Sequence, residues 1–432
     1  MEKLKKAARF ALDALVKAGA DKAQVNVSSG ENEEFNVDAG EFSLIRSVFS
    51  SGIAVKAIKD GKKGTASVNR LDRESIEEAV RECIDSADAG VPDNAVTIAE
   101  KEENCDFVSG VLKPDKALFF DSLIRFTEDV KREFPQIMIE QLVASYGHGK
   151  SVTANTNGVL FSEEDGCYSV SVMYSAHDGD KAASFNSFEI EFLDPGTDIM
   201  NSGIPRVMFE RAVKELDAVP FEGKFCSTAV FSPLCLSDFI SIIEGSFTGD
   251  YSLIEGVSPW KDKLGEKVAD ESFTLSVIPV DDRIICGERV TSDGYRSENF
   301  DIIKNGVLES FCLSEYGARK TGLKRAKSSS GCIEVKAGNT PLDEILKKID
   351  KGILVCRFSG GMPADNGDFS GVAKNSFLIE NGRIAGALTE TMISGNFADM
   401  LMHIEGISSE TVSDGSCVLP YVAFGQVTVS GK

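Results

Sequence analysis

The sequence has few of the residues from which metal and disulfide sites are usually built. Its 432 residues include only three histidines, and no two of the ten cysteines have Cys-x-x-Cys spacing. The common zinc-finger patterns are therefore excluded. The cysteines are scattered from Cys83 to Cys417, unlike a compact disulfide framework. We expect reduced, mostly buried thiols, as in a cytoplasmic protein.

Long apolar runs are also missing. The start of the chain is basic and then apolar, as in a signal peptide, but Asp13 and Lys17 interrupt the apolar stretch. Nowhere does the sequence reach the roughly 20 apolar residues that a membrane span needs. We therefore expect a soluble protein of the cytoplasm that makes no contact with a membrane.

Basic residues are outnumbered by acidic ones. The chain has 46 Lys and Arg against 68 Asp and Glu, which gives a net charge of -22. A surface of this sign repels phosphate backbones and anionic lipid headgroups. Direct binding of nucleic acid is therefore disfavoured. The hydrophobic share of 42% and the charged share of 26% are those of an ordinary globular protein.

Familiar catalytic motifs are absent as well. The sequence contains no Gly-x-Ser-x-Gly elbow, no P-loop and no Gly-x-Gly-x-x-Gly fingerprint. His148, His177 and His403 are far apart in sequence, and a zinc site made from all three is disfavoured. The acidic residues at 365–368 do not follow the order of a calcium loop, and we interpret them as a turn whose side chains bond the backbone.

The spacing of apolar residues predicts helices on an antiparallel sheet in the first half. An amphipathic helix is expected at 4–16, a second one begins after the capping residue Asp72, and others are expected at 115–133 and 206–216. The strands predicted around them lie at 53–58, 65–68, 137–146, 168–176 and 185–192.

The second half is richer in strands and turns. Asn-Gly pairs at 305–306 and 381–382 predict tight hairpins. Strands are expected at 353–358 and 376–379, and a short helix at 394–404. The fold class is therefore α+β. We expect an N-terminal α+β domain at residues 1–215 and a β-rich C-terminal domain at residues 216–432.

Short motifs rich in Gly, Asn and Asp follow one another from Thr153 onward. They are found at 153–158, 223–233, 258–260, 264–265, 280–282, 304–308, 367–371, 379–382 and 393–397. Each is weak alone, but their order and spacing resemble the TldD/PmbA family from about Gly19 to the C-terminus. An older label of that family is modulator of DNA gyrase, which we interpret as a genetic description because the chain is acidic.

The resemblance also identifies where the family holds zinc. In TldD-like members a helix carries His-Glu-x-x-x-His, and a distant Cys completes the ligands. Aligned on the Gly-Asp pair at 249–250, these positions fall on Ile240, Ser241 and Gly245. Ile240 and Gly245 have no donor atom for zinc, and the Ser241 hydroxyl is a poor base. Cys417 lies near the expected thiolate, in a register that the sequence does not fix.

The resemblance therefore implies the PmbA branch, also called TldE, which lacks the zinc motif. It implies a metallopeptidase subunit with no catalytic residue, metal or cofactor of its own and with zinc in its partner. The partner is a TldD-like subunit in a heterodimer or a second copy in a homodimer, and the substrates are small or unfolded polypeptides.

Glycines permit close approach of a backbone, so the segment 360–371 is a candidate wall of the peptide cavity. Its candidate contacts are Gly367, Asp368, Phe369 and Ser370. A plain connecting loop is an equally good interpretation of this segment. Two other functions stay open: a homodimeric peptide-binding or scaffolding protein without peptidase activity, and an independent hydrolase with an unrecognised site.

Overall fold

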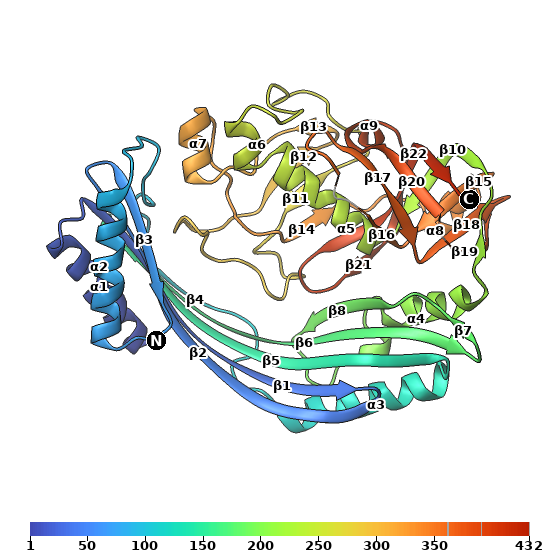
Figure 1. Cartoon of the computed structure of the whole chain (residues 1–432), viewed down its shortest axis with the longest axis horizontal. Helices are drawn as coiled ribbons and strands as arrows, with labels where there is room; N and C mark the ends of the chain where they lie inside the picture. Colours follow the sequence, from blue (N-terminus) through green and yellow to red (C-terminus); the bar gives the residue numbers. More distant parts are fainter. Residues whose placement is uncertain (361–362, 390, 432) are drawn as a thin grey trace.

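The structure is a computed structural model that describes residues 1–360, 363–389 and 391–431. It has the predicted α+β class: helices on an antiparallel sheet come first, and a β-rich half follows (Figure 1). The candidate segment 360–371 is therefore described except at residues 361 and 362. No helix in the described ranges has the length and hydrophobicity needed to cross a membrane.

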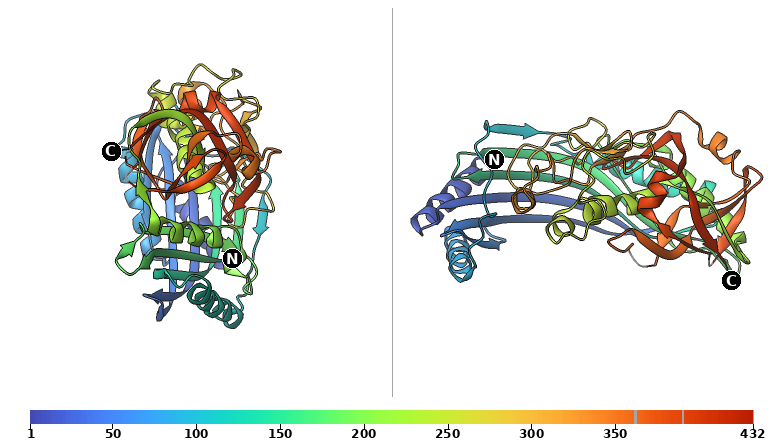
Figure 2. Two further views of the ribbon diagram at one scale, coloured as in Figure 1. Left: turned by 90° about the vertical axis from the view of Figure 1, so that its right-hand side faces the viewer. Right: turned by 90° about the horizontal axis from the view of Figure 1, so that it is seen from above.

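The N-terminal sheet is built from long, curved strands. Its main path has the order β3-β2-β1-β5-β6-β4, and β7 and β8 pair with β6. The strands are β1 (Lys22–Asp38), β2 (Glu41–Lys59), β3 (Lys62–Val68), β4 (Cys105–Val108), β5 (Ile137–Asn155), β6 (Leu160–Asp178), β7 (Lys181–Ala182) and β8 (Asn186–Phe192). Figure 2 shows that the long strands run the length of the molecule beneath the C-terminal half.

Helices cover the N-terminal sheet at its two ends. At one end lie α1 (Glu2–Lys17) and α2 (Arg73–Ala89), and at the other lie α3 (Lys116–Glu133), η1 (Ile199–Asn201), α4 (Pro205–Lys214) and η2 (Glu215–Asp217). The predicted cap of α2 is present: a carboxylate oxygen of Asp72 accepts from the Ser75 amide at 3.0 Å. Asp115 caps α3 in the same way, accepting from the Leu118 amide at 3.0 Å.

Two separate apolar cores therefore lie on one sheet. One core contains buried residues of α1 and α2 and of the parts of β1, β2 and β5 that these helices cover. The other contains buried residues of α3 and α4 and of the opposite parts of β1, β5 and β6. Between them, residues 28–32 of β1 and 147–151 of β5 are mostly polar, and Gly30 lies opposite Gly149. The same strands thus join two cores through a polar middle section.

The C-terminal sheet has the main path β13-β12-β11-β14-β22-β10-β15-β18-β19-β9. Its strands are β9 (Val219–Pro220), β10 (Lys224–Phe231), β11 (Leu275–Val277), β12 (Phe300–Lys304), β13 (Val307–Leu308), β14 (Ile333–Val335), β15 (Lys351–Val355), β16 (Arg357–Ser359), β17 (Asp368–Lys374), β18 (Ser376–Glu380), β19 (Arg383–Thr389), β20 (Thr391–Asn396), β21 (Ile404–Ser413) and β22 (Val418–Ser430). The helices of this half are α5 (Pro233–Ile242), η3 (Ile243–Phe247), α6 (Asp250–Ile254), α7 (Glu315–Thr321), α8 (Leu342–Leu346) and α9 (Phe397–Met402).

The predicted hairpin turns of this half are confirmed. Asn305 and Gly306 have φ of 47° and 81°, and Asn381 and Gly382 have 48° and 77°, the left-handed values that a tight Asn-Gly turn requires. The helix predicted at 394–404 is partly wrong. Residues 391–396 form strand β20. The helix is limited to α9 because its capping residue is Asn396, whose side chain accepts from the Asp399 amide. The predicted domain boundary at 215–216 falls within η2 and stays a prediction.

Candidate functional site

The helix at the family's zinc position begins regularly and ends in a wide turn. Ser232 caps α5 and Pro233 occupies its first turn. From Ile243 the helix widens into the π-helical turn η3, in which the Thr248 amide donates to the Ile243 carbonyl at 2.9 Å. Such turns are frequent at functional sites. A side chain on the following Gly249 would lie 2.5 Å from the Gly245 carbonyl oxygen, so glycine is needed there.

The three degenerate zinc positions have different surroundings. Ile240 is fully buried in the apolar core, and Ser241 is exposed with its hydroxyl donating to the Asp238 carbonyl at 2.6 Å. Gly245 faces a cleft, and a side chain added to it would meet no atom within 4 Å. These residues do not fit zinc, because none of them offers an imidazole or carboxylate ligand.

A cleft of about 430 Å³ lies beside η3. Its walls come from η3, α6, β11 and the loops before and after α7. The residues lining it are Glu244, Gly245, Asp250, Val277, Thr291, Asp293, Phe300, Cys312, Leu313, Ser314, Arg325, Ala326, Ser328, Ser329, Ser330 and Gly331. Acidic groups outnumber the single arginine in this lining, so the cleft is suited to a ligand that carries amide or amine donors.

Glu244 is the carboxyl group of the cleft that carries no partner. No hydrogen bond or ion pair to it occurs in the described part of the chain, and burial raises its pKa to about 7. Asp250, by contrast, is fully engaged: it accepts from the amide and the hydroxyl of Ser314. Glu244 is therefore the group in this cleft that can accept a donor from a ligand.

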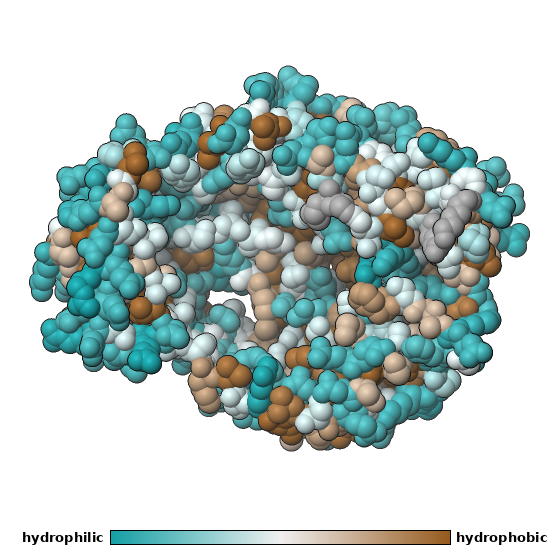
Figure 3. Space-filling view, viewed as in Figure 1, coloured by the Kyte–Doolittle hydropathy of each residue, from teal (hydrophilic) through white to brown (hydrophobic). Residues whose placement is uncertain are grey.

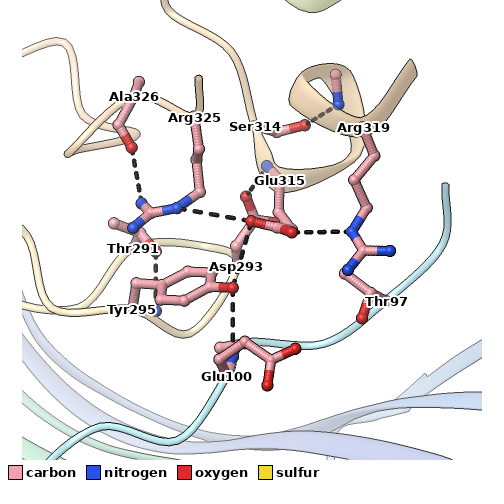
Figure 4. Close-up of polar contacts among 12 residues, drawn as sticks. Thr97, Glu100, Thr291, Asp293, Tyr295, Ser314, Glu315, Arg319, Arg325 and Ala326 are labelled. Carbon is pink, nitrogen blue, oxygen red and sulfur yellow. Dashed lines mark hydrogen bonds and ion pairs between the residues drawn. The ribbon is translucent and has the colours of Figure 1, made fainter. Parts of the chain in front are cut away.

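A polar network fixes the outer wall of the cleft (Figure 4). The Glu315 carboxylate accepts from Tyr295 at 3.2 Å and from Arg319 at 3.0 Å, and it pairs with Arg325 at 3.8 Å. The Arg325 guanidinium also lies 3.8 Å from the centre of the Tyr295 ring. The amide of Glu100, from the N-terminal half, donates to the Tyr295 hydroxyl. The network thus ties the cleft wall to the N-terminal half.

The segment around Gly367 lies next to η3 but outside this cleft. A side chain on Gly367 would lie 2.9 Å from the Phe247 ring, and Phe369 is buried with its ring centre 4.9 Å from that of Phe239. Asp368 accepts from Asn366 and Asn396, and these hydrogen bonds lower its pKa. The Asp368 amide donates to the side-chain oxygen of Asn366 at 3.1 Å, so the predicted turn, in which a side chain bonds the backbone, is present. Ser370 is exposed on β17, and peptide contact by this segment stays a prediction.

The remaining sequence candidates do not converge. The three histidines contact Glu164, Ser175 and the Asp399 carbonyl, respectively. Cys417 is buried, and its thiol donates to the carbonyl of Gly331, a cleft-lining residue, at 3.7 Å. Cys417 thus lies behind the cleft wall, and its correspondence to the family's thiolate stays a prediction. All ten cysteines are free thiols.

Sequence reasoning did not single out Glu244. The available signal was a lone acidic residue following the mostly apolar residues 239–243, which Ser241 interrupts. It also missed the network of Tyr295, Glu315 and Arg325, because those residues come from separate loops and α7 and share no sequence spacing.

Comparison with known proteins agrees with this architecture. Residues 223–431 match the PmbA/TldA metallopeptidase C-terminal domain, and residues 23–87 match the PmbA/TldA metallopeptidase domain 1. The two matched domains are thus those of a metallopeptidase family. The chain belongs to the PmbA/TldD family.

Relatives match over almost the whole chain. The metalloprotease PmbA of Escherichia coli O157:H7 is 25% identical over 96% of this chain and 95% of its own length. TldE from Thermococcus kodakarensis is 19% identical, with a TM-score of 0.85 over 99% of this chain and 100% of that one. A candidate modulator of DNA gyrase from Bacteroides thetaiotaomicron is 24% identical, with a TM-score of 0.83 over 99% of both chains.

Replacing Glu244 should change how stability depends on pH. A carboxyl group whose pKa is raised by folding costs stability once it ionises, so stability falls as pH rises from about 4.5 through about 7. In Glu244→Gln we expect this loss to disappear, with a gain of up to about 3 kcal/mol at pH 8 and little change at pH 4. Urea unfolding across this range measures the effect. Glu271→Gln, at an exposed position, is the matched control; equal pH profiles for the two variants would contradict the assignment.

Proposed function

We propose that this chain is a non-catalytic, PmbA/TldE-like subunit of a cytoplasmic TldD-type zinc peptidase that acts on small or unfolded polypeptides. The proposal rests on the family alignment, in which the two zinc ligands and the general base fall on Ile240, Ser241 and Gly245, in a helical segment that borders a cleft. A family member without donors at these positions depends on another subunit for the chemistry.

The cleft supports a role in holding a polypeptide. Its volume of about 430 Å³ suits a few side chains, and its acidic and hydroxyl groups can accept donors from a peptide backbone or amino group. Figure 3 shows that the molecule is also hollowed between the N-terminal sheet and the C-terminal half, which leaves room for an extended chain. Zinc is expected in the partner's site, across a shared cavity.

A free strand edge supports the existence of a partner. Within the described residues, β3 pairs only with residues 53–59 of β2, and the same edge of β2 from Glu41 to Gly52 pairs with no strand. This stretch carries large exposed apolar side chains, namely Phe42, Leu44, Ile45, Val48 and Phe49. An exposed apolar edge of this kind usually marks an interaction surface. The same edge also fits a second copy of this chain, which is the alternative assembly.

The experiment that tests the proposal is co-purification with a TldD-like paralogue that carries His-Glu-x-x-x-His, followed by metal analysis. We expect a stable heterodimer whose zinc content falls by about one per heterodimer when the paralogue's two histidines are changed. Ile45→Asp should weaken the assembly, whereas Val91→Asp, at another exposed apolar position, should not. Recovery of this chain only as a homodimer would favour the peptide-binding or scaffolding alternative.

A further inference from the structure

Two thiols and a carboxylate meet outside the degenerate zinc helix. Cys167 lies on β6, Glu191 on β8, and Cys286 in the loop between β11 and β12. The two sulfur atoms are 2.9 Å apart, and the sulfur atoms and a Glu191 carboxylate oxygen all lie within 4.8 Å of one another. The family's zinc positions on α5 and η3 contribute nothing to this group.

The strands place two of these residues on one face. Ser169 of β6 lies opposite Glu191 of β8 in the antiparallel register. Side chains alternate along a strand, so Cys167, two residues from Ser169, projects from the same face as Glu191. The neighbouring Gly166 is needed for close packing, since a side chain there would lie 2.1 Å from the Val111 carbonyl oxygen.

A glycine turn brings the third residue to them. The Glu191 amide donates to the Asp414 carbonyl at 2.8 Å, and the Ile285 amide donates to the Gly415 carbonyl at 2.7 Å. Gly415 has a φ of 99°, and a side chain on it would lie 2.6 Å from the Glu191 Cβ atom. The turn at 414–415 thus holds β8 and the loop that carries Cys286 against each other.

The surroundings favour a cation. A cavity of about 120 Å³ adjoins the group, and its lining includes three acidic residues, Glu163, Glu164 and Asp165, and one basic residue, Arg289. Within the group, Glu191 Oε2 is buried and has no hydrogen-bond partner in the described part of the chain. An unpaired buried carboxylate oxygen costs free energy unless a ligand or ion completes it.

We propose that Cys167, Cys286 and Glu191 form a binding site for a thiophilic divalent cation of the zinc class. Two thiolates and one carboxylate are ligands that zinc accepts, at about 2.0 to 2.3 Å, and three protein ligands leave a fourth position open. The adjoining cavity provides room at that position. Binding replaces the two thiol protons, which are released to solvent.

The carboxylate favours a metal site over a disulfide. Two sulfur atoms that share a tetrahedral zinc lie about 3.8 Å apart, so the thiols would separate by less than about 1 Å from their present distance. A disulfide would use only the two sulfur atoms and would leave Glu191 Oε2 without a partner. The group as a whole, with its acidic surroundings, is therefore explained better by a cation.

This site is separate from the family's zinc position and from the proposed peptidase function. The expectation of a chain without metal came from the family's zinc positions, the three scattered histidines and the cysteine spacing in the sequence, none of which considers residues that only the fold brings together. A cation held here connects the N-terminal sheet to a loop of the C-terminal half. Because it binds only where both halves are in place, it stabilises the folded protein.

The test uses the purified full chain, reduced and stripped of metal, and titrated with Zn²⁺ against a chromophoric chelator. We expect one equivalent of Zn²⁺, a rise in Tm when it binds, and thiolate-to-metal absorption when Cd²⁺ is used instead. Cys167→Ser, Cys286→Ser and Glu191→Gln should each weaken binding by more than about tenfold. Cys226→Ser, which removes an exposed thiol on β10, is the control and should leave binding unchanged.

Three results would overturn the site: no stoichiometric binding by the reduced protein, binding that none of the three ligand variants weakens, or an equal loss in Cys226→Ser. Thermal unfolding without metal shows whether each variant is folded. Glu191→Gln keeps both thiols and the shape of the side chain, so it tests the site even if a serine variant fails to fold.

Discussion

Peptide cleavage is expected only when this chain is mixed with a zinc-bearing TldD-like paralogue. The chain alone should be inactive, because Ile240, Ser241 and Gly245 provide neither zinc ligands nor a general base. Any residual rate of the paralogue alone should be at least about a hundredfold below that of the mixture, since orienting a peptide in a shared cavity can lower the barrier by about 3 kcal/mol. Cleavage of a small unfolded polypeptide, followed by chromatography, measures the effect.

Chelation and replacement of the paralogue's histidines should abolish this activity. Changing His148, His177 or His403 singly in this chain should not, because they lie apart from one another and from the cleft. Ile240→His combined with Gly245→His should leave the chain inactive alone, since Ser241 still stands where the general base belongs. If the paralogue alone reaches the full rate of the mixture, the support role is wrong.

The replacement Phe239→Ala should have the largest effect on stability. The Phe239 ring is 1% exposed, and it lies between the rings of Phe231, Phe369 and Phe397 at centroid distances of 4.8 to 5.2 Å. Truncating such a side chain leaves a cavity and costs about 3 to 5 kcal/mol. We expect a corresponding fall in the free energy of unfolding, measured by denaturant titration.

Phe239 also anchors α5 immediately before the turn that carries Glu244, so its truncation should disturb the wall of the cleft as well. Phe49→Ala is the matched control: that ring is 73% exposed, and its removal should change stability by no more than about 0.5 kcal/mol. Similar losses in the two variants would show that the aromatic cluster around α5 is not a principal source of stability.

Much of the fold could be predicted from local signals. The cap at Asp72, the start of the helix near Asp115 and the Asn-Gly turns depend on a few neighbouring residues, and the structure has them where the sequence places them. The helix predicted at 394–404 began too early. Apolar and small residues at 392–396 fit a strand and a helix equally well at this length, and pairing with β17 and β22 decides for the strand.

Only the part of the candidate site that lies within a continuous sequence motif could be predicted from the sequence. The alignment at 249–250 pointed to Ile240, Ser241 and Gly245, which the structure places on α5 and η3, whereas the unpaired state of Glu244 depends on loops brought in from residues 291–331. Cys167 and Cys286 are 119 residues apart, and no spacing rule connects them. Tertiary contacts of this kind leave no local pattern in one sequence.

The polar middle of the N-terminal sheet has a consequence for how the protein loses its structure. Since β1 and β5 pass without interruption through both apolar cores, neither end can come apart without breaking backbone hydrogen bonds that extend toward the other. The two cores therefore behave as one cooperative unit despite the distance between them. In the middle section Gly30 faces Gly149 and few side chains are buried. The sheet can therefore change its curvature most easily there. Small movements of the two ends relative to each other then bend this section while both cores stay packed.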